Sequence, residues 1–353
     1  METDDRATAC HWMLLRLAGW IPDGLLSQSR TWLGQGRLHD VAKAVTHAVL
    51  TARVRINPDD LDLLAELHND LGSVPSVLQT VETTEIEPIP AFGFATEQPG
   101  PADSEQPSVK AAAAQRELLD GMEQAVVTAA SDAASVLAIW RAWRFPADRA
   151  PWPPPRRVFV VETDEDASLV SVTAALQAAL TAAGDPEPQV EVYPTQTDPP
   201  VYQQLARGVG ALVWARRPDP GIRLAPVFDE VDEETGPRLR PDHSTVDARE
   251  RDLLLGYLSR GTLLMESTSG MADVWDREAG PAVPISFRTD GYWIWSDATT
   301  YYLHEYSLTP APAFLEHIRA RGYTFEAVDG AAVHRALAVL EEPLDSQPVW
   351  QMG

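Results

Sequence analysis

The run Arg157-Val158-Phe159-Val160-Val161 decides the fold class of this 353-residue chain. Four of its five residues are apolar, and no glycine or proline interrupts them. A short continuous apolar run is typical of a strand that is buried on both faces, as in a sheet covered by helices. The sequence therefore predicts a central strand here, and the neighbouring segments indicate what surrounds it.

Strand and helix patterns alternate after this run. We expect further strands at 189–193, 211–215 and 222–228, with helices at 167–183 and 199–208. A β-α-β-α-β order is typical of a sheet with parallel strands and covering helices. The sequence therefore predicts an α/β fold, or α+β over the whole chain, with a mixed, partly parallel sheet in the larger domain.

A tight hairpin is predicted further along the chain. Asp290-Gly291 separates two strand-like runs, 283–288 and 293–295. Asp-Gly favours a two-residue turn in which both central residues have positive φ, and such a turn would place residue 288 opposite residue 293. The remaining elements expected in this part are a strand at 262–266 and helices at 246–259, 297–306, 310–321 and 330–341.

The same hairpin supplies the best candidate for recognition. Alternation along the strands would put Arg288, Trp293 and Trp295 on one face of the sheet. An exposed arginine beside two tryptophans could stack on a base, a sugar or a side chain of a partner. The alternative is that the helix at 297–306 covers this face as a second core layer, since most tryptophans are largely buried.

The N-terminal part has a helical pattern. Four helices are expected within residues 1–72, and the fourth carries the clearest signals. Asn57 can cap it, Pro58 suits its first position, and Gly72 can end it. A strand is expected at 81–86.

Residues 93–108 separate the helical N-terminal part from the elements that follow. Residues 93–108 are rich in proline, glycine and acids, which is typical of a flexible linker. Two helices are expected after it, at 109–130 and 133–144. The predicted organisation is a helical domain at 1–92, a linker at 93–108, a helical segment at 109–145 and an α/β domain at 156–353.

The net charge is −24, from 28 basic and 52 acidic residues. An acidic chain repels phosphate backbones, so we expect no nucleic-acid partner. Residues 56–109 hold eleven acids and no lysine or arginine. A basic protein could dock there, although a solvated surface is the simpler interpretation.

Cysteine content and the N-terminus indicate the compartment. Cys10 is the single cysteine, which fits a reducing environment. The N-terminus, Met1-Glu2-Thr3-Asp4-Asp5, is acidic, unlike a secretory signal, and the longest uncharged apolar-leaning run, 169–184, is too short to span a bilayer. We therefore expect a soluble cytoplasmic protein with no membrane contact.

Sequence motifs for catalysis and cofactors are missing. The chain has no P-loop, no glycine-rich dinucleotide motif, no His-Glu-x-x-His and no paired cysteines. We therefore expect no cofactor and no metal, and we assign no catalytic residue. Asp164 and Asp166 follow the strand at 157–161 and weakly resemble the first motif of haloacid-dehalogenase phosphatases, although Ala167-Ser168 replaces the expected Gly-Thr. These carboxylates could hold Mg²⁺ or cap the next helix.

Two segments resemble an uncharacterised family of actinobacterial proteins. They are the Cys10–Leu17 helix and the Phe287–Trp295 hairpin with the helix that follows it. The resemblance implies a cytoplasmic bacterial protein. It transfers no activity and no functional residue.

Two functions remain open from the sequence. The leading hypothesis is an intracellular, non-enzymatic protein-binding protein of an adaptor or toxin-neutralising kind. The alternative is an enzyme that acts on a small or nucleotide-like substrate at the C-terminal edge of the 157–228 sheet. An enzyme should have a deep pocket where Asp164, Glu266 and Arg288 converge, whereas a binding protein should have a broad, shallow apolar or acidic face.

Overall fold

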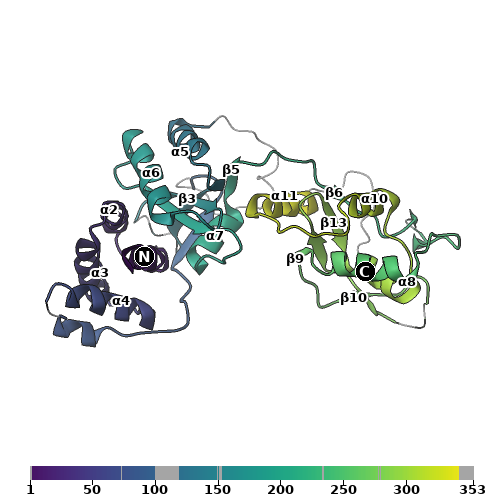
Figure 1. Cartoon of the computed structure of the whole chain (residues 1–353), viewed down its shortest axis with the longest axis horizontal. Helices are drawn as coiled ribbons and strands as arrows, with labels where there is room; N and C mark the ends of the chain where they lie inside the picture. The colour runs from purple at the N-terminus through teal and green to yellow at the C-terminus, as the bar shows by residue number, and fades with distance from the viewer. Residues whose placement is uncertain are drawn as a thin grey trace. The chain divides into compact units, whose positions relative to one another are not determined.

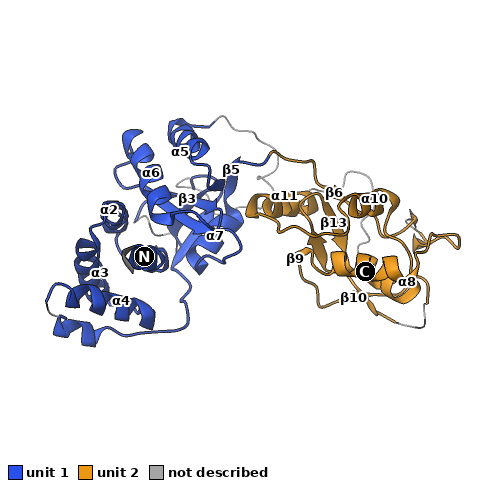
Figure 2. Cartoon of the chain, viewed as in Figure 1, with its two compact units in different colours: residues 1–217 blue, residues 218–353 orange. Residues whose placement is uncertain are grey.

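The computed structural model divides the chain into two compact units, Met1–Arg217 and Pro218–Gly353 (Figure 2). Each unit combines helices with a β-sheet, and each sheet contains both parallel and antiparallel strand pairs. The predicted α/β class with a mixed, partly parallel sheet is therefore confirmed. The residues that the structure describes are 2–72, 74–99, 119–148, 150, 153–232, 234–276, 278 and 280–341.

Unit 1 opens with the four predicted helices. The side-chain oxygen of Asn57 accepts a hydrogen bond from the backbone N–H of Asp59 at 2.9 Å, and Pro58 holds the first helical position. The capping pattern in the sequence is therefore confirmed. The four helices are α1 (Glu2–Arg16), α2 (Asp23–Gly34), α3 (Leu38–Ala52) and α4 (Pro58–Asn69) (Figure 1).

A five-stranded sheet forms the centre of unit 1. Its strands are β1 (Phe92–Ala95), β2 (Val136–Pro146), β3 (Arg156–Thr163), β4 (Gln189–Pro194) and β5 (Ala211–Ala215). The order is β1-β2-β3-β4, and β5 also pairs with β2. The parallel pair is β3 with β4, whereas β2 is antiparallel to β1, β3 and β5. The predicted βαβ succession thus holds for β3 and β4, but the next strand returns to β2 instead of extending the parallel row.

Residues 133–144 form no helix, so the predicted helical segment at 109–145 is wrong over this part. The valine and tryptophans at 136, 140 and 143 fit the spacing of a helix, but β2 pairs with strands along both of its edges. Its composition, rich in tryptophan, valine, isoleucine and phenylalanine, suits a strand, and tertiary pairing outweighs the helical spacing. The helix before it is α5 (Gly121–Asp132), and residues 109–118 lie outside the described residues.

The boundaries near residue 92 also differ from expectation. Residues 81–86 form no strand; a 3₁₀ helix, Ser76–Thr80, precedes them, and one bridge joins Ile56 to Thr83. Strand β1 instead lies at the start of the predicted 93–108 linker, of which residues 100–108 lie outside the described residues. Contacts divide the chain after Arg217, so the N-terminal helices and the sheet belong to one unit.

Helices α6 (Leu169–Ala182) and α7 (Val201–Val209) confirm two further predictions. An apolar core of unit 1 joins α5 and α6 to one face of the sheet, around Phe159, Val161 and Val192. Helix α7 packs against β1, β2 and β3. Strand β4 is the outer strand beyond β3 in the sheet order, and side chains of α1 and α2 contact it.

The sheet of unit 2 has four strands in the order β6-β13-β12-β9. They are β6 (Arg223–Leu224), β9 (Thr262–Met265), β12 (Phe287–Thr289) and β13 (Trp293–Ser296). The predicted strand at 222–228 is reduced to two residues, which pair in parallel with β13 instead of extending the sheet of unit 1. The helices, all predicted, are α8 (Ala248–Leu258), α9 (Asp297–Tyr306), α10 (Pro312–Ala320) and α11 (Gly330–Glu341). Two short hairpins complete the unit: β7 (Glu230–Asp232) with β8 (Gly236–Arg238), and β10 (Gly270–Met271) with β11 (Val283–Pro284).

The β12–β13 hairpin forms, but its register differs from the prediction by two residues. Arg288 pairs with Trp295, and the turn is closed further along the chain than expected. The Asp290 carboxylate accepts hydrogen bonds from the backbone N–H groups of Tyr292 and Trp293, at 2.9 and 2.7 Å. Of the two predicted turn residues, Gly291 alone has positive φ, at 83°. A shift of two residues leaves each side chain on its predicted face.

Candidate functional site

The two tryptophans of the predicted recognition face lie in the core of unit 2. Trp293 is 5% exposed and Trp295 is 0% exposed. Phe314 of α10 packs on both rings, with centroid distances of 5.4 and 5.2 Å, and Tyr257 of α8 lies 6.2 Å from Trp295. This burial agrees with the alternative that helices cover the face, although α8 and α10 supply most of the cover with a smaller part from α9.

Arg288 differs from the two tryptophans because its side chain is partly exposed. Its Nε donates to Asp297 Oδ1 at 2.8 Å, and its Nη1 donates to the carbonyl of Gly261 at 3.0 Å. The side chain, 27% exposed, lines an open depression of about 370 Å³ between α8 and α9. The residues around this depression are Leu255, Ser259, Pro284, Arg288, Asp297, Thr300, Tyr301 and His304.

Helix α9 contributes one face to this depression. Asp297, Thr300, Tyr301 and His304 are spaced by three, one and three residues, so they project from one side of the helix. The Thr300 hydroxyl is buried and has no hydrogen-bond partner among the described residues. The depression therefore combines apolar surface from Leu255, Pro284 and Tyr301 with five polar or charged side chains.

The alternative carboxylate site does not form a cluster in the described residues. Asp164 follows β3, and its backbone N–H donates to Ser135 O at 2.8 Å, whereas Asp166 is exposed. The residue before α6 is Ser168, so neither aspartate caps that helix. Across the described residues, no group of three or more His, Cys, Asp or Glu side chains could hold a metal ion. Glu266 is exposed and does not line the Arg288 depression.

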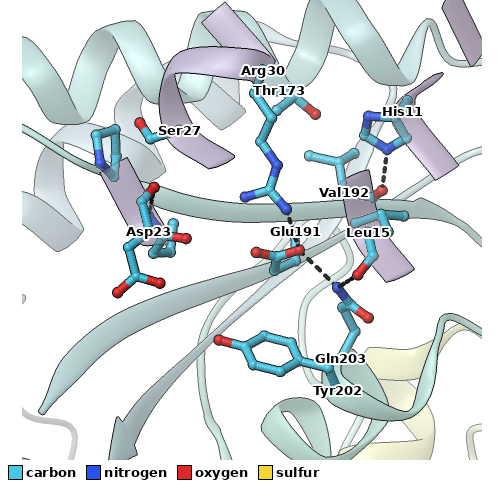
Figure 3. Close-up of polar contacts among 12 residues, drawn as sticks. His11, Leu15, Asp23, Ser27, Arg30, Thr173, Glu191, Val192, Tyr202 and Gln203 are labelled. Atoms are coloured by element: carbon cyan, nitrogen blue, oxygen red, sulfur yellow. Dashed lines mark hydrogen bonds and ion pairs between the residues drawn. The ribbon is translucent and has the colours of Figure 1, made fainter. Parts of the chain in front are cut away.

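A buried polar cluster in unit 1 was missed from the sequence. Arg30 is 1% exposed and Glu191 is 0% exposed, and they form an ion pair with an N–O distance of 2.5 Å. Gln203 Nε2 donates to the same carboxylate at 2.8 Å and to the carbonyl of Leu15 at 3.0 Å (Figure 3). The buried polar cluster, Arg30 with Glu191 and Gln203, thus links α1 and α2 to β4 and α7.

The polar contacts of α2 follow one side of the helix. Asp23, Ser27 and Arg30 are four and three residues apart, which places them on one face. Asp23 accepts two hydrogen bonds from Arg144, at 2.5 and 2.8 Å, and the Ser27 hydroxyl accepts one from Gln177 at 3.0 Å. The helix also buries Leu26 and Leu33, so apolar contacts, hydrogen bonds and charge together hold it against its neighbours.

His11 satisfies a backbone group of β4. Its Nε2 donates to the carbonyl of Val192 at 2.8 Å, which covers part of an outer strand that would otherwise offer its backbone to another chain (Figure 3). Burial lowers the pKa of His11 to about 4, because the charged ring would lose its water. His11 is therefore neutral at pH 7, with the proton on Nε2.

Solvent does not reach the buried polar cluster. Arg30 Nε and Nη1, Glu191 Oε1 and Gln203 Oε1 are buried without hydrogen-bond partners among the described residues. A substrate would need an opening to reach these atoms, and each of the three side chains is at most 1% exposed. The arrangement fixes α2 in place and offers no access for chemistry.

The buried carboxylates of unit 2 also hold structure together. Asp290 accepts hydrogen bonds from Tyr257 at 2.5 Å and from His317 at 2.7 Å, which ties α8 and α10 to the hairpin. Asp273 accepts hydrogen bonds from Tyr306 and Tyr301 at 2.6 and 3.1 Å, which ties its loop to α9. The hydrogen bond to Asp273 and burial raise the pKa of Tyr306.

An exposed apolar feature lies inside the acidic stretch. Ile86 and Ile89 are 80% and 77% exposed, the highest values among the large apolar side chains of the described residues. They belong to residues 81–91, here called the acidic segment, which contains Glu82, Glu85 and Glu87.

The backbone of the acidic segment is fixed to the body of unit 1. Ile56 exchanges two backbone hydrogen bonds with it, at 3.2 Å to Glu82 O and 2.9 Å from Thr84 N. The Glu87 carboxylate accepts from the backbone N–H of Val201 at 2.7 Å, and Pro90 is buried. Hydrogen bonds therefore fix the backbone of the segment that carries the two isoleucines.

Comparisons with protein-family models, curated proteins and solved structures give no match. The actinobacterial resemblance therefore stays a prediction. In the part of the chain that the structure describes, no helix has the length and apolar character needed to cross a bilayer.

Proposed function

We propose that this chain is a non-enzymatic protein-binding protein, of an adaptor or toxin-neutralising kind, and that the acidic segment is its contact surface. The observation that carries the proposal is the exposure of Ile86 and Ile89, 80% and 77%, on a backbone held by hydrogen bonds. Exposed apolar surface is typical of sites that contact another protein, and these two side chains lie three residues apart in one segment.

Apolar contact supplies the affinity in this proposal. Burying an isoleucine side chain contributes roughly 1.5–3 kcal/mol. Because Thr84 and Glu87 already anchor the backbone, little conformational entropy is lost when a partner binds. Preorganised apolar side chains of this kind are suited to a stable contact.

Charge indicates the chemistry of the partner. Glu85 and Glu87 flank Ile86, and residues 56–109 contain no lysine or arginine. A partner that covers both isoleucines must therefore place its own apolar side chains beside basic ones. The proposed partner is a protein with a basic, amphipathic segment, whose association is accelerated by charge and weakened by salt.

The placement of the ionisable groups favours binding over catalysis. Glu191 and Asp290 are buried in intramolecular hydrogen bonds, and Arg288, which lines the depression, is paired with Asp297. The enzyme alternative would use the end of β3, where Asp164 and Asp166 lie. No observation on these two residues favours the enzyme alternative. A negative result in the experiment below would favour it instead.

Photo-crosslinking tests the proposed function in the native host. A photoreactive amino acid at position 86 should give a discrete adduct with a basic protein. The matched control is the same amino acid at Glu316, an exposed position on α10 of unit 2, which should not give that adduct. Failure to obtain a protein adduct at 86, or the same adducts at both positions, would contradict the proposal and leave the enzyme alternative.

A further inference from the structure

The Arg288 depression in unit 2 carries a second, independent proposal. We infer that it binds a carboxylate group attached to a small apolar body, either a free small molecule or the C-terminus of a polypeptide. This site does not depend on the partner proposed for unit 1, and the residues that form it come from α8, α9 and the sheet of unit 2.

Arg288 is positioned to receive a carboxylate. Asp297 holds its Nε and the carbonyl of Gly261 holds its Nη1, so the guanidinium is fixed before any ligand arrives. Its Nη2 has no hydrogen bond to a described residue, and Nη1 retains a second N–H. These terminal N–H groups form the fork that binds the two oxygens of a carboxylate.

The Thr300 hydroxyl is the second polar group of the site. It lines the depression, is buried and has no partner among the described residues. A buried hydroxyl is normally hydrogen-bonded, and leaving it unpaired is unfavourable. The hydroxyl is shielded from solvent in this conformation, and a rotation of the Thr300 side chain into the depression would let a ligand oxygen accept its hydrogen bond.

The charges around the depression and its volume limit the class of ligand that can bind. Arg288 is already paired with Asp297, and Glu305 lies beside His304 at 2.7 Å. A singly charged carboxylate meets less repulsion from these acids than a phosphate dianion would. The volume of about 370 Å³ lies near the lower end of the usual range for ligand pockets, and Leu255 and Tyr301 offer apolar contact.

Binding of phenylacetate to the full chain tests this inference. Titration monitored by NMR should give saturable shifts of the Arg288 Nε–H signal and of α9 amides. Phenylacetamide, which has the same apolar body without the charge, should not saturate the site, and inorganic phosphate should bind more weakly than phenylacetate. Equal binding of phenylacetate and phenylacetamide, or no binding of either, would overturn the inference.

Two variants assign the binding to this site. Thr300→Val removes the hydroxyl at nearly constant volume and should weaken phenylacetate binding roughly fivefold, as expected for one hydrogen bond. Arg288→Lys keeps the charge but loses the fork and should weaken binding further. Thermal unfolding checks that both variants fold. Unchanged affinity in folded Thr300→Val would contradict the assignment even if Arg288→Lys failed to fold.

Peptides distinguish the two sources of the carboxylate. A short peptide ending in phenylalanine with a free carboxylate is compared with its amidated form. If the free peptide binds more tightly than phenylacetate, the ligand is a polypeptide C-terminus; if phenylacetate alone binds, it is a free small molecule. Equal binding of the free and amidated peptides would count against a carboxylate site.

Discussion

The two units use different kinds of side chain to pack their helices against neighbouring elements. In unit 1, α2 meets its neighbours through a buried ion pair, Arg30 with Glu191, and a second pair, Asp23 with Arg144. In unit 2, α8 and α10 pack aromatic rings on the sheet, with Trp295 fully buried against Phe314, beside the hydrogen bonds that Tyr257 and His317 donate to Asp290. A buried charge depends on its partner and on protonation, whereas a buried ring depends on shape and area. The units should therefore respond differently to mutation and to pH.

Breaking the buried ion pair should have the largest effect. Arg30→Met leaves the Glu191 carboxylate buried without its cation, and we expect a loss of about 3–5 kcal/mol in the free energy of unfolding. Chemical denaturation measures this loss. The double variant Arg30→Met/Glu191→Leu removes both charges and should recover most of it; a double variant as unstable as the single one would show that charge compensation is unimportant here.

Removing a ring from unit 2 should be almost as damaging. Trp295→Ala should cost about 3–5 kcal/mol, because it leaves a cavity beside Phe314. Trp293→Ala, at 5% exposure, should cost nearly as much. Tyr292→Ala, in the same hairpin but 45% exposed, is the matched control and should cost far less. Small losses in both tryptophan variants would mean that the rings are exposed in solution.

The pH dependence of unit 1 should reflect His11. The pKa of His11 is about 4 in the folded chain and 6.5 as the reference value, so the unfolded chain binds the proton more tightly. Stability is then complete above pH 6.5 and falls as the pH drops from 6.5 to 4, by roughly 3 kcal/mol. His11→Gln keeps a donor for Val192 and should remove this part of the dependence. If wild type and His11→Gln lose stability equally over this window, His11 is not buried neutral.

The smallest structural effect concerns the hairpin turn. Gly291 has φ of 83°, so Gly291→Val should cost roughly 1–3 kcal/mol through backbone strain. A Cβ there would also meet the Ala332 Cβ at 3.4 Å. Gly36→Val, at φ of 72° with open space around it, is the control for strain without contact. If Gly291→Val unfolds like the wild type in a denaturant titration, the turn is not held at this φ.

Local signals in the sequence predicted much of the fold. The caps and apolar stripes gave the helices, and Val158 to Val161 gave the buried strand, because these features depend on neighbours along the chain. Strand β2 was missed because pairing along both edges, a tertiary effect, decides its conformation. The position of β5 depends on β2 and was missed with it.

The candidate site was predictable in part. Arg288 was chosen for its place in the hairpin, and the hairpin does bring it to a depression, but α8 and α10 bury the two tryptophans. The buried polar cluster has one local signal in the sequence, since Glu191 stands between two valines in the predicted strand at 189–193. Its partner, Arg30, lies 161 residues away, and no spacing rule connects them.

The central claim is that the acidic segment binds a basic protein through Ile86 and Ile89. Calorimetric titration of the crosslinked partner, once purified, against Ile86→Ser/Ile89→Ser tests it most directly, with Val231→Ser, a half-exposed apolar residue of unit 2, as control. We predict that the double variant keeps its stability but loses at least about 2 kcal/mol of binding free energy, the scale for burying such side chains, and that binding by the wild type weakens as salt is raised. Wild-type affinity in the double variant, or binding that is indifferent to salt, would contradict the account.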